Sequence, residues 1–228
     1  MSWILPTPEG RRAYWDDRFG GDRTVFGQEP NRFVAEYLAG LAPCSVLDLG
    51  AGQGRNAVWL ATQGHRVTAV DLSPIAGEQT RAAATAAGVE VETVTADLTT
   101  WAPPGNAFDL VLLSYLQLVP EQRAVVHAAA ASAVAPGGMV FLIAHHADNL
   151  EHGIGGPQIP DVLFVEADLA ADFSAFDIER LGPVRRPVAV EGGTVDAIDI
   201  VMIARRPAER PRSSELKRIG TRQGYAEP

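Results

Sequence analysis

Residues 46–74 decide the fold of this chain, and they read VLDLGAGQGRNAVWLATQGHRVTAVDLSP. A short apolar run ends in the glycine-rich turn at 50–54. A helix-like segment follows, and a second apolar run ends at Asp71. This order of strand, glycine turn, helix, strand and acid is typical of the opening of a nucleotide-binding βαβ unit. The glycines let the backbone approach a ligand closely, and the acid is placed to accept hydrogen bonds from two ribose hydroxyls.

The spacing of the glycines indicates which nucleotide binds. A dinucleotide fingerprint has the form G-x-G-x-x-G, but its third glycine would fall here on Arg55. The chain has instead the pattern D-x-G-x-G-x-G from Asp48 to Gly54. This pattern resembles motif I of the class I S-adenosylmethionine (SAM) dependent methyltransferases. The alternatives are a nicotinamide site with a degenerate third glycine and a tight turn in an unrelated α/β protein.

The resemblance implies that SAM is the cofactor and S-adenosylhomocysteine (SAH) the product. It places the methionine part of SAM on Gly50 and Gly52 and its ribose on Asp71. It also implies that Asp97, which follows the expected third strand, accepts from the adenine amine. An ordinary turn role for Asp97 is the alternative. The other residues that we expect at the cofactor are Trp15, Asn56, Leu72, Leu98 and Ser114. For Trp15, a place in the hydrophobic core is the alternative.

Strands and helices alternate along the rest of the chain. We expect seven strands, at 45–49, 66–70, 89–95, 108–114, 139–145, 176–181 and 197–204. We expect helices within 9–40 and at 73–87, 120–134 and 167–173, and we expect Ser73 to be the N-cap of the helix at 73–87. The pattern predicts an α/β protein with a doubly wound, mostly parallel seven-stranded sheet and helices on both faces, which is the Rossmann-like fold of the SAM methyltransferases. Ligands of such sheets bind at the carboxyl ends of the strands.

We interpret residues 1–204 as one methyltransferase domain. Within it, residues 1–43 form an N-terminal helical lid or substrate cap, and residues 44–204 form the sheet core. Residues 205–228 are a tail rich in arginine and proline. This tail is either solvated or a docking arm on its own subunit or a neighbouring one, so a homodimer is possible.

Composition narrows the class of protein. The net charge of −9 repels phosphate backbones, so we expect a small-molecule substrate and no nucleic acid. The sequence has no apolar run of 18 residues and no secretory signal, so we expect no membrane association. The single cysteine, Cys44, excludes an intrachain disulfide. Together these features favour the cytoplasm.

A narrower resemblance is to the tellurite-resistance-type branch of the class I methyltransferases, which acts on small molecules. It rests on Gly54-Arg55-Asn56, on Tyr14-Trp15 and on residues 163–169, which we interpret as a strand-to-helix lid segment. Residues 145–150 and 155–158 are similar to small methyltransferases from high-GC bacteria.

Two histidines, His145 and His146, end the expected fifth strand and are the candidate catalytic residues. An imidazole titrates near neutral pH and can take a proton from an attacking hydroxyl. Alternation along a strand sends the two rings to opposite faces, so at most one meets the substrate. Our first choice is His145, and a structural role for the histidines stays open.

We expect no metal in the site. The cluster of His145, His146, Asp148 and His152 leaves metal binding as an alternative. Catechol-type O-methyltransferases have a similar Asp-Asn pair after strand five, but they also need an acid at the end of strand four. Here that position is Ser114.

These features predict a SAM-dependent methyltransferase that methylates a hydroxyl of a sugar or another polar metabolite, with a histidine base. One alternative is methylation of a thiol or an anionic chalcogen oxide by orientation alone. The other is a SAM-binding protein without catalysis.

Overall fold

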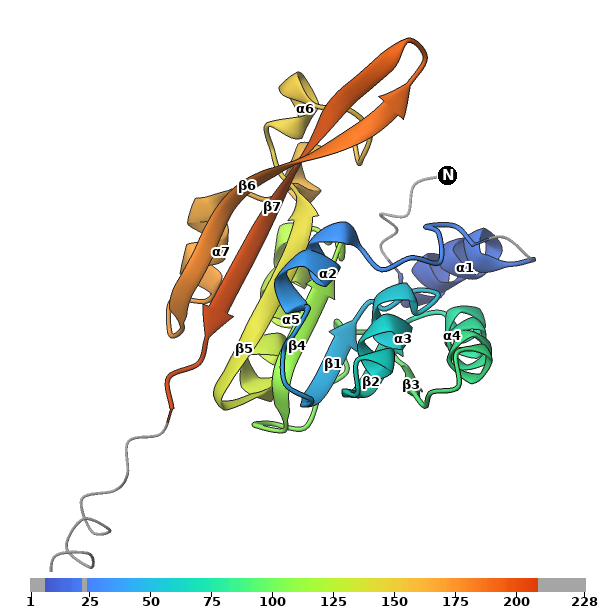
Figure 1. Ribbon diagram of the computed structural model, residues 1–228. Coiled ribbons are helices and arrows are strands. Elements are labelled where there is room, and N and C mark those ends of the chain that lie inside the picture. The colour runs from blue at the N-terminus through green and yellow to red at the C-terminus, as the bar shows by residue number, and fades with distance from the viewer. Residues whose placement is uncertain (1–6, 22–23, 209–228) are drawn as a thin grey trace, which may run out of the picture.

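A single seven-stranded sheet forms the centre of the computed structural model, which describes residues 7–21 and 24–208. The order of its strands is β3-β2-β1-β4-β5-β7-β6, and every neighbouring pair is parallel except those that involve β7 (Figure 1). The strands are β1 (Ser45–Leu49), β2 (Arg66–Asp71), β3 (Glu92–Thr95), β4 (Phe108–Ser114), β5 (Val134–His145), β6 (Asp177–Val190) and β7 (Gly193–Arg205). The predicted fold class is confirmed.

Helices cover both faces of this sheet. They are α1 (Pro8–Phe19), α2 (Arg32–Leu38), α3 (Arg55–Thr62), α4 (Pro74–Ala86), α5 (Pro120–Ala133), α6 (Asn149–His152) and α7 (Glu166–Asp172), with a 3₁₀ turn at Pro160–Val162. Helices α2 and α3 pack on one face, and α5 and α7 pack on the other. Helix α4 begins as the sequence predicts, because the side chain of Ser73 caps it by accepting a hydrogen bond from the backbone N–H of Ala76 at 3.2 Å.

The core explains why the central strands are apolar on both sides. Side chains alternate between the two faces of a strand. Thus Leu47 and Leu49 of β1 pack with α5 and α7, while Val46 packs with α2 and α3. In β4, Val111 and Leu113 lie on the first face, and Leu110 and Leu112 on the second. A strand covered by helices on both faces needs apolar residues at nearly every position.

The last two strands are much longer than the sequence predicts. Strand β6 continues from the expected end at Leu181 to Val190, and β7 starts at Gly193 instead of Ala197. Their far halves pair only with each other and extend past the end of β5 as a two-stranded ribbon (Figure 1). Pro183 and Pro187 interrupt the strand pattern, but β6 is an edge strand, where a residue without a backbone N–H is tolerated.

Residues 163–169 do not form a lid. The side chains of Phe164 and Leu169 are fully buried in the core cluster under α5. The backbone of Phe164 forms an isolated parallel bridge with His146. This prediction was wrong because apolar residues before a helix look alike in a lid and in a core. Part of the expected N-terminal cap also lies in the core, since Phe33 and Val34 of α2 are buried against the sheet. Residues 209–228 of the expected tail lie outside the described residues.

Gly54, just before α3, provides a test of the packing between α3 and α4. Its φ is +79°, and a Cβ there would come within 2.5 Å of Thr80 Cγ2. We expect Gly54→Ala to lower the free energy of unfolding by about 2–4 kcal/mol, from the left-handed backbone and the clash together. The matched control is Gly88→Ala, where φ is +70° and no atom lies within 4 Å. It should cost only about 1 kcal/mol. If urea unfolding shows that both variants lose the same free energy of unfolding, the packing argument is contradicted.

Candidate active site

A cavity of about 820 Å³ opens at the carboxyl ends of β1, β2, β4 and β5. It lies beside the boundary between β1 and β4. There the strand order reverses, because β2 and β3 lie on one side of β1 and β4 lies on the other. Open α/β sheets bind ligands at such a point. Its wall includes all the residues that the sequence predicts at the cofactor: Trp15, Gly50, Gly52, Asn56, Asp71, Leu72, Asp97, Leu98 and Ser114. Of the two candidate catalytic residues, His145 lines the cavity and His146 is not part of its wall.

The turn after β1 brings bare backbone to the cavity. Gly50 and Gly52 have φ values of +72° and +55°, which a residue with a side chain rarely adopts. A Cβ at Gly50 would also come within 2.9 Å of the Leu116 side chain. The backbone N–H of Gly50 donates to the carbonyl of Val70 at 2.8 Å, which ties the turn to the end of β2.

Asp71 joins this turn to the next helix. Its carboxylate accepts from the backbone N–H of Gly52 at 2.8 Å and from that of Ser73 at 2.9 Å. Burial raises the pKa of Asp71, and the backbone hydrogen bonds from Ser73, Gly52 and Leu72 oppose this shift. Each carboxylate oxygen can accept a further hydrogen bond, so two neighbouring hydroxyls of a ribose fit the geometry.

Asp97 already has partners on both oxygens. Its Oδ1 accepts from the backbone N–H and the hydroxyl of Thr99, and its Oδ2 pairs with Arg11 Nη2 at 2.8 Å. Burial acts to raise the pKa of Asp97, but the hydrogen bonds from Thr99 and the charge of Arg11 outweigh it and lower the pKa below its usual value. The sequence analysis missed Arg11. Nothing in the local pattern of an exposed-looking helix marks one arginine as the partner of an acid 86 residues away.

Helix α1 closes one side of the cavity. The Trp15 ring stacks on Phe19, with centroids 5.3 Å apart, and both side chains line the cavity. The helix is held to α4 by Asp16, which accepts from the hydroxyl of Ser73, and by the carbonyl of Phe19, which accepts from Gln79 Nε2 at 2.8 Å. The loop after α1 is held by buried Asn56, whose Oδ1 accepts from the backbone N–H of Asn31 at 2.8 Å.

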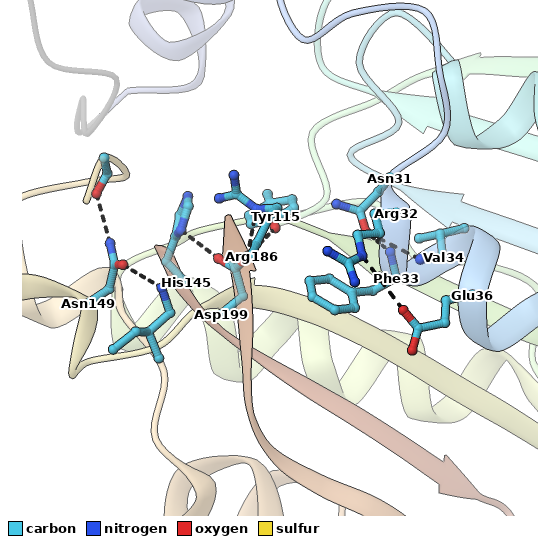
Figure 2. Close-up of polar contacts among 12 residues, drawn as sticks. Asn31, Arg32, Phe33, Val34, Glu36, Tyr115, His145, Asn149, Arg186 and Asp199 are labelled. Carbon is cyan, nitrogen blue, oxygen red and sulfur yellow. Dashed lines mark hydrogen bonds and ion pairs between the residues drawn. The ribbon is translucent and has the colours of Figure 1, made fainter. Parts of the chain in front are cut away.

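The other end of the cavity holds a network centred on Asp199 of β7 (Figure 2). This carboxylate is fully buried, and its Oδ2 accepts from the Tyr115 hydroxyl at 2.8 Å and from Arg186 Nε at 2.9 Å. Its Oδ1 lies 2.9 Å from His145 Nδ1, an ion-pair contact without the alignment of a hydrogen bond. Burial acts to raise the pKa of Asp199, but contacts with His145, Arg186 and Tyr115 together outweigh it and lower the pKa below its usual value. The carboxylate therefore stays charged at neutral pH.

Tyr115 and Gly156 hold the His145 ring in place. Tyr115 has a φ of +53°, uncommon for a bulky residue, and its ring centroid lies 4.8 Å from that of His145. Gly156 lies against the imidazole so closely that a Cβ would come within 3.0 Å of it. Backbone held in such a conformation is frequent at functional sites.

His146 points away from the cavity, as alternation along a strand requires of the neighbour of His145. Its Nδ1 accepts from the backbone N–H of Asp148 at 3.1 Å, and its Nε2 lies 3.2 Å from Glu166 Oε2 at the start of α7. The ring is nearly buried. Its contacts tie the end of β5 to the segment before α7.

Sequence reasoning missed Arg186 and Asp199. Asp199 carried a signal, because it lies within the apolar run Ile198–Met202 and acids are rarely buried without a partner. Arg186 carried none, since it lies between the expected strands at 176–181 and 197–204 and follows a glycine and a proline.

Residues 7–21 and 24–208 contain neither a group of metal ligands nor a membrane-spanning helix. In these ranges no three histidine, cysteine or acidic side chains are grouped as metal ligands. No helix within the same ranges has the length and apolar character needed to cross a membrane.

Comparisons with known proteins agree with this geometry. Residues 46–138 match the family model described as methyltransferase domain. Over 137 residues the chain is 34% identical to the ubiquinone biosynthesis O-methyltransferase of Salmonella arizonae, covering 58% of this chain and 56% of that protein. The protein of the same name from Xanthomonas euvesicatoria is 32% identical over 132 residues, which is 56% of this chain and 54% of the relative. The chain thus spans about half the length of the curated relatives it matches.

Solved structures share the fold. One, from work on the conversion of a disulfide bond into a thioacetal group during echinomycin biosynthesis, has a TM-score of 0.70 at 22% identity and covers 95% of this chain and 99% of its own. TehB from Haemophilus influenzae has a TM-score of 0.65 at 19% identity, covering 86% and 66%. The N-methyltransferase NodS from Bradyrhizobium japonicum, in complex with SAH, has a TM-score of 0.67 at 16% identity, covering 86% and 98%.

The predicted fold is therefore confirmed, and the matched domain supports the predicted class of protein, whereas the branch from high-GC bacteria stays a prediction. Residues 46–138 match a methyltransferase domain, and the chain shares the fold of solved structures that include an N-methyltransferase in complex with SAH.

Proposed function

We propose that this protein transfers the methyl group of SAM to a hydroxyl group of a small polar molecule, with His145 as the general base. The observation that carries the proposal is the pairing of His145 with buried Asp199 in the cavity that also contains the glycine turn and Asp71. A base oriented by a buried carboxylate is useful for an acceptor that must lose a proton.

The residues of the cavity fit SAM. The turn at Gly50 and Gly52 offers bare backbone with positive φ at both residues, and a side chain at Gly50 would clash with Leu116. This backbone suits the methionine part. Asp71 would accept from the ribose hydroxyls, and Asp97 and Leu98 line the place of the adenine. When bound there, SAM supplies a methyl group that its sulfonium already activates for displacement.

The protein's own task is to align the acceptor and to remove its proton. Because His145 Nδ1 faces Asp199, its Nε2 is the nitrogen left to accept the proton of the hydroxyl. Asp199 stabilises the resulting imidazolium, and Arg186 and Tyr115 hold Asp199 in place. Burial raises the pKa of Tyr115 above its usual value, so its hydroxyl stays a hydrogen-bond donor.

The relatives named ubiquinone biosynthesis O-methyltransferase support a hydroxyl as the acceptor. The net charge of −9 supports a free small molecule over a nucleic acid. A sugar or another polar metabolite remains our proposal for the acceptor. Methylation of a thiol or a chalcogen oxide would need no base, and a SAM-binding protein without catalysis would show no turnover.

SAM binding should depend on Asp71. The variant Asp71→Asn loses part of its capacity to accept from the ribose, so SAM affinity measured by calorimetry should fall by about 10- to 100-fold. The control is Asp109→Asn, which changes a carboxylate at the opposite end of the sheet, where Asp109 accepts from Ser45. SAM affinity that stays at the wild-type level in folded Asp71→Asn would refute the cofactor site.

Catalysis should depend on His145. We expect His145→Ala to lower kcat by about 10²–10⁴ while SAM affinity stays nearly unchanged, because the base acts only in the chemical step. Asp199→Asn should also lower kcat. Methyl transfer from labelled SAM to an acceptor found by screening measures both.

The matched control is His146→Gln, which changes the neighbouring ring outside the cavity. It should affect stability more than turnover. If His146→Gln abolishes turnover and His145→Ala does not, the assignment of the base is wrong. If neither matters, an orientation-only mechanism is the better account.

The reaction should need no metal. The end of β4 carries Ser114, where a metal-dependent catechol-type enzyme would need an acid. We expect full turnover after treatment with EDTA and removal of the chelator by dialysis. Activity that disappears with EDTA and returns with magnesium would contradict this prediction.

A further inference from the structure

The wall of the cavity is positive although the chain is acidic. Five arginines line it against three acids, while the whole chain has a net charge of −9. The arginines are Arg11, Arg18, Arg32, Arg55 and Arg186, and the acids are Glu29, Asp71 and Asp97. Such a local excess of one sign attracts a ligand of the opposite sign.

Arg55 is the arginine that most needs a counterion. It is the first residue of α3, and its Nη1 donates to the carbonyl of Phe26 at 2.8 Å. Within the described part of the chain, no carboxylate lies within ion-pair distance of it. Burial lowers the pKa of Arg55. A partly desolvated guanidinium that has no carboxylate counterion destabilises the protein unless a ligand supplies the negative charge.

The buried acid that interacts electrostatically with Arg55 is a poor partner for it. Asp48 in β1 is fully buried, and neither of its oxygens has a hydrogen-bond partner among the described residues. Burial and the neighbouring charge of Asp71 raise the pKa of Asp48 to about 7. The carboxyl is therefore only partly ionised at neutral pH, and it does not neutralise Arg55 fully.

Arg186 offers donors on the same side of the cavity. Its Nε binds Asp199 at 2.9 Å, and its side chain also has a hydrogen bond with Tyr115. A guanidinium has five N–H donors, so these two contacts do not use them all. Both Arg55 and Arg186 interact electrostatically with Tyr115, whose ring lies against His145. Both guanidinium groups thus interact with the residue whose ring contacts the proposed base.

We infer that the methyl acceptor is a hydroxy acid, whose carboxylate is bound by Arg55 and Arg186 while its hydroxyl faces His145. The inference rests on the proposed function and names the substrate class of the same site. Planar guanidinium groups match a carboxylate with two parallel hydrogen bonds. The hydroxyl is required because a base has no task on an acceptor that is already ionised.

The test uses the full-length protein loaded with SAH. The probes are matched pairs of a hydroxy acid and its primary amide: the three hydroxybenzoates with the hydroxybenzamides, and lactate with lactamide. Binding is measured by thermal shift and calorimetry at constant ionic strength. We expect at least one acid to bind at least about tenfold more tightly than its amide, because only the acid makes charge-assisted bonds. If no acid binds, or if acids and amides bind alike, the inference is overturned.

Variants assign the binding to its residues. Arg55→Gln should weaken acid binding by about tenfold or more without changing SAM affinity. The matched control is Arg185→Gln, which removes the same charge from an exposed position on β6. Arg185 precedes Arg186 in the sequence, and its Nη1 lies 3.6 Å from Asp196 Oδ2. This control should leave acid binding unchanged.

The two proposals fail in distinguishable ways. If Arg55→Gln weakens SAM binding and spares the acids, Arg55 serves the methionine carboxylate and the inference is wrong. A wild-type protein that binds neither SAM nor SAH contradicts the proposed function itself. Normal SAM binding with no preference for acids overturns only the inference.

Discussion

The hydrogen bonds that the Asp71 carboxylate accepts from Gly52 and Ser73 connect the parts of the site. Through them, the end of β2 fixes the glycine turn after β1 and the start of α4. Ser73 in turn caps α4 and donates to Asp16, so the same chain of contacts reaches the helix that closes the cavity. A buried acid is costly unless donors compensate it. This constraint explains why the glycine turn, the cap of α4 and helix α1 are connected through one residue.

A second buried acid organises the other half of the cavity. Asp199 lies on β7, the one strand antiparallel to its neighbours, and it reaches the end of β5 because β7 pairs along that strand from His145 onwards. Three different elements supply its partners, His145 on β5, Tyr115 after β4 and Arg186 on β6. The sheet thus brings the proposed base His145, the carboxylate of Asp199 and two hydrogen-bond donors close together.

The two halves differ in how their charge is balanced. At the cofactor half, each acid has backbone or arginine donors within the protein. At the end that contains His145, Arg186 pairs with Asp199, whereas no carboxylate of the described residues lies within ion-pair distance of Arg55. The acids at one end of the cavity thus have partners within the protein, while an arginine at the other end has no carboxylate counterion in the described part of the chain. This arrangement would suit SAM together with the proposed acceptor, which brings its own negative charge.

Features that depend on residues close together in the sequence could be predicted from the sequence alone. The strands at β1 and β4 and the cap of α4 could be predicted to the residue, because apolar runs, glycines and caps act over a few positions. The residues expected at the cofactor lie in one cavity for a related reason, since parallel strands bring all their carboxyl ends to one edge.

Contacts between distant segments were decided only by the tertiary structure. Alternation predicts that His145 and His146 face opposite ways, but which one meets the cavity depends on where β7 and α7 pack. The partners Arg11 and Asp97 are 86 residues apart, and Tyr115 and Asp199 are 84 residues apart. Arg186 entered the site because β6 continues through Pro183 and Pro187, which an edge strand tolerates. Local sequence carries no record of such pairings, because they form only when the sheet assembles.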